Sequence, residues 1–207
     1  GEMEESELGL IPKGWRVGKL GEEFDITMGQ SPPGTSYNEK REGTAFFQGK
    51  TDFGFRFPEN RIYCTEPKRF ANKNYTLLSV RAPVGEINIA VEKCCIGRGV
   101  AGIIHKKGYF SYTYYILKGL REEFNKYDKE GTVFGSINKD SLENIKTVIP
   151  FENIIGKYQE KVGSLDNEIY ELSMEIKKLT QIRDTLLPKL MNGEIDFHNS
   201  PPAPLFI

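Results

Sequence analysis

Basic and polar side chains recur beside glycines and aromatic residues in the first half of the chain, at places where strands are expected to end. They are Lys40, Arg41, Gln48, Lys50, Arg56, Arg81 and Arg98. Arginine and lysine hydrogen-bond guanine in the major groove of DNA, glutamine hydrogen-bonds adenine, and the cations can equally hold phosphates. One such residue alone is more typical of a surface ion pair, so the recurrence at turns is what favours a nucleic-acid-reading face. The sequence does not separate base readers from phosphate holders.

The charge of the chain is unevenly distributed along its length. Residues 1–12 carry four acids and no base, whereas residues 13–121 carry 18 Lys and Arg against 10 Asp and Glu. Residues 122–150 carry 4 against 6, and residues 151–207 carry 6 against 9, so the net charge of −1 hides a basic body. This pattern is expected where only the body meets a polyanion. A solvated surface of uneven charge would give the same pattern.

Motifs for catalysis are fragmentary. Residues 97–102 spell G-x-G-x-x-G, but a turn at residues 106–108 follows where a dinucleotide site needs a helix. Residues 49–51 resemble the end of a phosphate loop whose first glycine is misplaced, and His105 and His198 have no partners at triad or zinc spacing. We therefore expect no catalytic residue, no metal site and no cofactor.

The cysteines and the hydropathy of the chain indicate where it works. Cys64, Cys94 and Cys95 have no metal-binding spacing, and an odd number with two adjacent members fits a reducing compartment better than a disulfide framework. No apolar run approaches the ~18–20 residues that span a membrane, and the acidic N-terminus is not a secretory signal. These features predict a cytoplasmic protein without a membrane partner.

The elements that would position the basic residues belong to an α+β fold. Glycine and proline punctuate residues 13–150 heavily, and short β-branched or aromatic runs lie between them. We predict strands at 44–48, 75–80, 87–91, 102–105 and 145–149, and a helix at 109–124. Residues 1–12 are an N-terminal segment, and 13–150 form a strand-rich globular domain.

A long helix is predicted for residues 151–192, followed by a tail at 193–207. Apolar residues recur from Phe151 to Leu179 in steps of 4 and 3, the heptad pattern of a coiled coil. A helix packed on its own domain is shorter and buries a wider stripe, so the narrow seam favours pairing with a second long helix. The predicted dimerisation residues are Ile155, Tyr158, Val162, Leu165, Ile169, Leu172, Ile176 and Leu179.

Five segments in order resemble one protein family. They are the IPKGW of residues 11–15 with LGE at 20–22, LSVRAPVGEI at 78–87, CIGRGVA at 95–101, GTVFGSI at 131–137 and LLPKLMNGEI at 186–195. Each segment alone is weakly specific, but their order over residues 11–197 resembles the specificity subunits of type I restriction–modification systems. The resemblance has most weight around Arg81 and Arg98.

The resemblance implies a non-catalytic subunit in which residues 13–150 are a target-recognition domain for double-stranded DNA. It implies that the long helix is a spacer that docks DNA methyltransferase (modification) subunits, which bind S-adenosylmethionine, and that an ATP-dependent restriction subunit can join. Members of the family typically hold two recognition domains and two helices, whereas this sequence has one of each. We therefore expect a homodimer that reads a bipartite target.

Two other classes of function fit part of the sequence. The chain could be the recognition part of a DNA methyltransferase, but no cofactor-binding motif precedes it. It could also be a coiled-coil DNA-binding regulator, which would place its basic residues on a helix that enters the groove. The basic residues here fall in expected strands and turns, which favours the specificity subunit.

Overall fold

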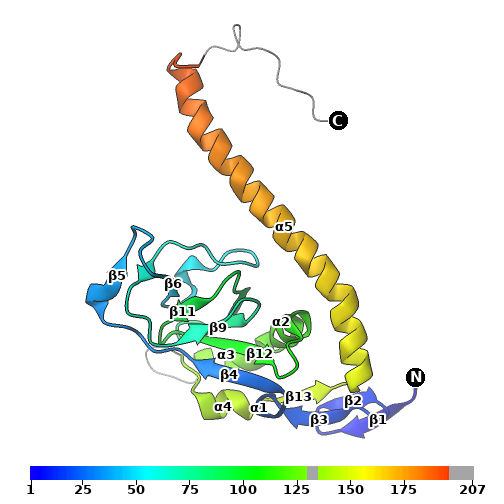
Figure 1. Cartoon of the computed structure of the whole chain (residues 1–207). Helices are drawn as coiled ribbons and strands as arrows, with labels where there is room; N and C mark the ends of the chain where they lie inside the picture. The colour runs from blue at the N-terminus through cyan, green and yellow to red at the C-terminus, as the bar shows by residue number, and fades with distance from the viewer. Residues whose placement is uncertain (130–134, 196–207) are drawn as a thin grey trace, which may run out of the picture. The chain divides into compact units, whose positions relative to one another are not determined.

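The computed structural model describes residues 1–129 and 135–195 and divides into two compact units, Gly1–Gly163 and Ser164–Ile207 (Figure 1). The first unit carries all the strands of the described residues, and helix α5 (Glu152–Met191) begins in the first unit and continues into the second. The predicted α+β class with a long C-terminal helix is confirmed. Residues 131–134 of the GTVFGSI segment and 196–207 of the predicted tail lie outside the described residues.

A four-stranded antiparallel sheet forms the centre of the first unit. Its strands run in the order β10 (Val84–Ile89), β9 (Thr76–Val80), β12 (Val100–His105) and β4 (Phe24–Met28). Successive side chains of a strand point to opposite faces, so Leu78 and Ile103 belong to one buried cluster while Leu77 and Val100 belong to another. The sheet is covered on both faces, which explains why β9 and β12 are buried throughout.

A second sheet of five short strands shares one of these clusters. Its order is β5 (Tyr37–Asn38), β7 (Tyr63–Cys64), β6 (Thr44–Phe47), β11 (Cys94–Ile96) and β8 (Phe70–Ala71). Only the β6–β11 pair within it is parallel among the pairings described. Phe47 and Ile96 pack with Leu77 and Val100 of the central sheet, so the ends of β6 and β12 are held in fixed relation.

Two small sheets complete the first unit. β1 (Met3–Ser6) pairs with β2 (Gly9–Pro12), and β3 (Arg16–Lys19) pairs with β13 (Lys146–Ile149), both antiparallel. The β3–β13 pair joins the two ends of the globular part of the chain, with Val17 opposite Val148.

Short helices cover the other face of the central sheet. They are α1 (Leu20–Glu23), α2 (Phe110–Gly119), α3 (Arg121–Lys129) and α4 (Lys139–Glu143), with 3-10 turns at η1 (Gly34–Ser36) and η2 (Lys50–Asp52). Tyr112, Leu117 and Phe124 enter the buried cluster of Leu78 and Ile103. The single helix predicted at 109–124 is two helices, and the break follows Gly119, a residue type that destabilises a helix interior.

Most predicted strands agree with the structure to within two residues. Those at 44–48, 75–80, 102–105 and 145–149 correspond to β6, β9, β12 and β13. The strand predicted at 87–91 begins earlier, at Val84, because the chain reverses at residues 81–83 and Val84 pairs directly with Val80.

Helix α5 has 40 residues, in agreement with the helix predicted at 151–192. Its first turns pack within the first unit, where Ile155 is buried and the Gln159 side-chain oxygen accepts from the Ser111 amide at 2.9 Å. The helix ends before Gly193, which adopts φ 71°, and the Glu194 amide donates to the Lys189 carbonyl at 2.9 Å. Among the described residues no helix is long and apolar enough to span a bilayer.

Candidate nucleic-acid interface

The turn that joins β11 to β12 presents Arg98 at the surface. The Gly97 amide donates to the Phe47 carbonyl at 2.9 Å and the Gly99 amide to the Gln48 carbonyl at 3.2 Å, so the turn lies directly on the end of β6. A Cβ at Gly99 would be 2.4 Å from that Gln48 carbonyl oxygen. Glycine is therefore required there for close backbone approach, and the exposed Arg98 is held in a fixed place.

Ser31 joins Gln48 to this turn. The Ser31 hydroxyl donates to Gln48 Oε1 at 3.1 Å and accepts from the Arg98 amide at 3.3 Å. An amide oxygen has two acceptor positions, so Gln48 keeps one acceptor position and its amino group for a ligand. Gln48 and Arg98 were each predicted from the sequence, whereas Ser31 was not, because its only signal is its place in the Ser-Pro-Pro-Gly turn.

Arg81 lies at the same end of the central sheet. It follows Val80, whose amide donates to the Gly99 carbonyl at 2.9 Å and whose carbonyl accepts from Ile137 at 3.1 Å. The next turn is held by the Ser79 hydroxyl, which donates to the Pro83 carbonyl at 2.8 Å and accepts from the Glu86 amide at 2.9 Å. Arg81 is exposed and projects from a well-anchored strand end.

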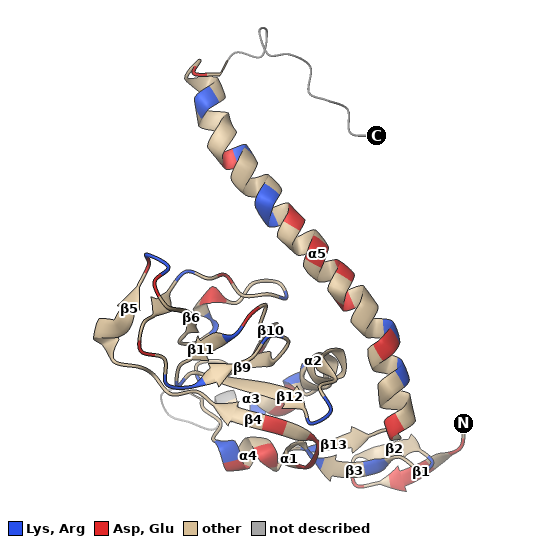
Figure 2. Ribbon diagram, in the orientation of Figure 1, with Lys and Arg blue, Asp and Glu red and all other residues tan. Residues whose placement is uncertain are grey.

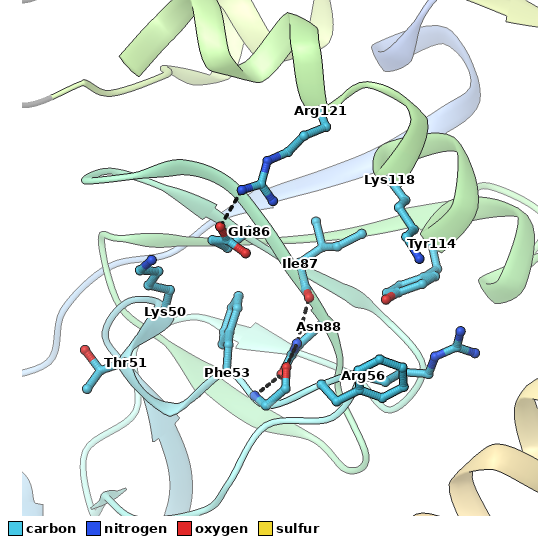
Figure 3. A pocket seen from close by; sticks show the side chains of 12 residues that line it. Lys50, Thr51, Phe53, Arg56, Glu86, Ile87, Asn88, Tyr114, Lys118 and Arg121 are labelled. Carbon is cyan, nitrogen blue, oxygen red and sulfur yellow. Dashed lines mark hydrogen bonds and ion pairs between the residues drawn. The ribbon is translucent and has the colours of Figure 1, made fainter. Parts of the chain in front are cut away.

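Lys50 extends the group along the chain. It begins η2 two residues after Gln48 and lines a cavity of about 480 Å³ (Figure 3). Within the described part of the chain, Lys50, Arg81 and Arg98 form no ion pair with a carboxylate. We call Gln48, Lys50, Arg81 and Arg98 the polar edge; its three cations are free to meet an external anion.

Several other cations of the first unit pair with acidic side chains. Arg61 Nε contacts Asp52 Oδ1 at 2.8 Å, Lys107 Nζ contacts Glu152 Oε1 at 2.9 Å, and Arg121 Nη2 contacts Glu86 Oε1 at 2.6 Å. Lys and Arg are marked on the ribbon in Figure 2. Lys40, Arg41 and Lys118 are also exposed and have no carboxylate partner among the described residues, so the polar edge is distinguished from the remaining basic surface by its place on anchored strand ends and turns.

Lys40 and Arg41 are exposed but belong to another place. They precede β6, whereas Gln48 follows it, so they lie at the opposite end of that strand. Asn38 shapes their loop, because its side-chain oxygen accepts from the Lys40 and Glu42 amides, each at 3.1 Å. The structure does not bring Lys40 and Arg41 together with the polar edge.

Arg56 does not have the surface role expected from its turn sequence. Its side chain is 7% exposed, its Nη2 donates to the Tyr115 hydroxyl at 2.8 Å, and its guanidinium lies 5.0 Å from the Tyr114 ring centroid. The interaction with α2 desolvates the guanidinium and uses its ring-stacking capacity. We therefore assign Arg56 an internal anchoring role.

An aromatic ring adjoins the polar edge. The Tyr37 hydroxyl donates to the Pro32 carbonyl at 2.9 Å, and its ring centroid lies 4.7 Å from that of Phe46. Burial raises the pKa of Tyr37, while Ser31 and Arg98 act in the opposite direction. Tyr37 therefore stays neutral and supports the loop of Ser31 as a hydrogen-bond donor.

The remaining candidate groups are buried and structural. The three cysteines are free and buried, and burial raises the pKa of Cys94 to about 12. Burial also lowers the pKa of His105, against the influence of Glu23, whose Oε2 lies 3.6 Å from His105 Nε2. Among the described residues no group of three His, Cys, Asp or Glu side chains could hold a metal ion. The G-x-G-x-x-G of residues 97–102 runs into strand β12, so the segment opens no helix that could bind a dinucleotide.

The predicted dimerisation residues divide between the two units. Ile155 is 2% exposed in the core of the first unit, and Tyr158 packs there against Tyr112 and Tyr115. Ile155 serves the domain's own core, which corrects its assignment to a seam with a second helix, whereas Tyr158 packs against that core and stays partly exposed. Val162 and Ile169 are half-buried, whereas the seam positions further along α5 are exposed: Leu165, Leu172, Ile176 and Leu179.

Comparison with known families identifies the chain. Residues 12–181 match the model of the type I restriction modification DNA specificity domain. The chain belongs to this family. The resemblance inferred from the five sequence segments is thereby confirmed.

Individual relatives carry the same description. The chain is 37% identical over 197 residues to the specificity subunit assigned to the type I restriction enzyme MjaX of Methanocaldococcus jannaschii, which covers 93% of this chain and 46% of that protein. The HindI specificity subunit of Haemophilus influenzae is 25% identical over 205 residues, covering 89% and 42%. The crystal structure of the HsdS subunit from Thermoanaerobacter tengcongensis aligns with a TM-score of 0.64 and 34% identity, over 89% of this chain and 46% of that one. The chain thus spans less than half the length of the curated relatives it matches.

Proposed function

We propose that this chain is the DNA-reading component of a type I restriction–modification enzyme and that it contributes no catalytic group. The observation that carries the proposal is the polar edge. A specificity-family domain places one glutamine and three cations at strand ends and in the adjoining turn η2, where they face solvent and form no ion pair with a carboxylate of the described residues. Such a set matches the donors that read base edges and hold phosphates.

The geometry suggests how reading is divided. Gln48 and Arg98 are linked through Ser31, so they approach a duplex together and in fixed register. Arg98 and Arg81 carry the forked guanidinium that binds guanine bidentately, whereas Lys50 is a point charge suited to phosphate. We assign Gln48, Arg81 and Arg98 to the base edges and Lys50 to the backbone.

Two copies would read a bipartite site. The exposed heptad positions of α5 from Leu165 to Leu179 provide an apolar seam that a second α5 would cover. Identical chains related by a two-fold axis read identical, inverted half-sites. Modification subunits docked on the helices would supply methyl transfer from S-adenosylmethionine, and an ATP-dependent restriction subunit would join where the system also cleaves.

The test uses the full chain assembled with the modification subunit of its system. The methylated motif in cells that express both proteins supplies the target duplex, and binding is followed by fluorescence anisotropy. Replacing Gln48 or Arg98 with alanine should weaken binding of the target duplex by ~1–3 kcal/mol and relax the preference at one base pair. Lys50→Ala should weaken binding of all duplexes equally and reduce the slope of log binding constant against log salt concentration by ~0.9.

A surface cation that already has an acidic partner is the matched control. Lys13 Nζ contacts Glu2 Oε2 at 2.6 Å, so Lys13→Ala should leave affinity, specificity and salt slope unchanged. If the assembled wild-type chain showed no preference for the methylated motif, or if the polar-edge variants behaved as Lys13→Ala does, the proposal would be wrong.

A further inference from the structure

Phe55 is the most exposed of the large apolar side chains in the described residues, at 92%. It stands between Gly54 and Arg56 in the loop that follows η2, seven residues after Gln48. A phenylalanine ring carries a large apolar surface that favours burial. Full exposure in the free protein therefore needs an explanation.

The loop that carries Phe55 is held firmly on both sides. Phe53 and Pro58 form an antiparallel bridge across its base. The buried Asn88 side chain accepts from the Gly54 amide at 2.9 Å and donates to the Gly54 carbonyl at 3.0 Å. These bonds fix the residue before Phe55.

The residue after Phe55 is anchored as well. The Arg56 carbonyl accepts from the Ile89 amide at 2.8 Å, and its guanidinium is bound by Tyr115 of α2. The exposure of Phe55 is thus imposed by its neighbours, because a loop fixed at Gly54 and Arg56 cannot turn the ring inward. The ring is presented in advance of any partner, which lowers the ordering entropy lost on binding.

The surroundings of Phe55 are basic. It lines the cavity of about 480 Å³ together with Lys50 of the polar edge, Lys118 of α2 and Arg121 of α3. Figure 3 shows the cationic side chains around this cavity, with Arg121 bonded to Glu86. Glu86, the one acid among the lining residues, pairs with Arg121, and Arg56 is buried against α2, so Lys50 and Lys118 are the cations without an acidic partner among these residues. An aromatic ring set among cations is the arrangement by which proteins stack on bases while holding phosphates.

We propose that Phe55 is a wedge that packs against the bases of the target duplex beside the groove read by the polar edge. This inference rests on the proposed function and adds a contact that sequence reasoning did not assign. The ring would enter at a base step and partly unstack it, as apolar wedges of DNA-bending proteins do. The step beside each half-site should therefore be deformed in the complex.

The test uses the full chain with its modification subunit and the duplex of the methylated motif. Phe55→Ala should weaken binding by about 5- to 150-fold, the range expected for the loss of one stacked base. Phe55→Trp should bind close to the wild type, and its added indole emission should be quenched with the same midpoint as binding. Because the wild type already contains Trp15, its emission is subtracted from that of Phe55→Trp.

The matched control is Leu10 of β2, also exposed in the first unit at 64%. Leu10→Ala should bind normally and Leu10→Trp should show no quenching. Since Phe55 has little packing to lose, Phe55→Ala should keep the wild-type melting temperature, so that weaker binding is not due to unfolding.

The possible results distinguish failure of the wedge from failure of the proposed function. Normal binding by Phe55→Ala, or quenching no greater than for Leu10→Trp, would overturn the wedge while leaving the proposed function standing. Normal DNA binding with loss of the modification subunit would show that the loop docks a protein, which also overturns the wedge. No preference of the wild-type chain for the methylated motif would overturn both proposals.

Discussion

Charge placed in the apolar seam of α5 should dissociate the dimer. We consider Leu172→Glu with Ile176→Glu, because these side chains are 50% and 64% exposed in the single chain. Full burial of a leucine or isoleucine is worth ~1.5–3 kcal/mol, so about half of that, ~0.75–1.5 kcal/mol, remains to be gained by each side chain on pairing.

Two side chains on each of two helices give a loss of about 3–6 kcal/mol in the free energy of dimerisation. At ~1.4 kcal/mol per tenfold, the dimer dissociation constant should rise by about 10²- to 10⁴-fold, before any penalty for burying the carboxylates. Sedimentation equilibrium over a range of concentrations measures this change directly. The first unit should keep its unfolding transition, since neither residue belongs to its core.

The control adds the same charge on the opposite face of the helix. Asn167→Glu with Gln181→Glu changes two exposed positions outside the heptad seam and should leave the dimer intact. The reasoning would be refuted by a wild-type chain that stays monomeric, or by a Leu172→Glu, Ile176→Glu variant that dimerises as tightly as the control.

Three further predictions address the turn, the spacer and the buried histidine. Gly99→Ala places a Cβ 2.4 Å from the Gln48 carbonyl oxygen and should lower the free energy of unfolding by ~1–3 kcal/mol and weaken DNA binding. Gly49→Ala is the control, because its Cβ would have no atom within 4 Å, and it should change neither. Calorimetry measures the stability of the two variants, and fluorescence anisotropy measures their DNA binding. Deletion of one heptad, residues 170–176, should shorten the unread gap of the methylated motif by about three base pairs, since seven helical residues rise ~10 Å, and an unchanged gap would remove the spacer role. Because burial lowers the pKa of His105, the unfolded chain binds more protons than the folded chain near this pKa, so the free energy of unfolding should be full above about pH 6.5 and decline as the pH falls below it. Denaturant titrations should show a flatter decline between about pH 6.5 and 5 for His105→Gln than for the wild type. An identical decline in the two proteins would refute the assignment.

The strands and helices that depend on local sequence patterns could be predicted, whereas the contacts between residues far apart in the sequence could not. The strands at β6, β9, β12 and β13 and the long helix follow from β-branched runs, turn residues and heptad spacing. Arg56 illustrates the limit. Its neighbours indicate an exposed turn, but Tyr114 and Tyr115, about sixty residues later, bury its guanidinium. No local pattern encodes that contact.

The candidate site and the seam show the same limit. Gln48 and Arg98 were recognised as polar groups at turns, but their link through Ser31 depends on how β6 meets the β11–β12 turn. The heptad pattern includes Ile155, yet periodicity reports only which face of a helix is apolar and not what covers it. At Ile155 the cover is the chain's own core.

The most direct test of the account is a map of methylated bases in cells that express the modification subunit with this chain or with its Arg98→Ala variant. The account predicts that methylation with the wild-type chain marks a bipartite motif with two identical, inverted halves. With Arg98→Ala, the preference at one base pair in each half should be relaxed while the gap keeps its length. A motif that is the same with either chain, or the same when this chain is omitted, would contradict the claim that its polar edge reads the DNA.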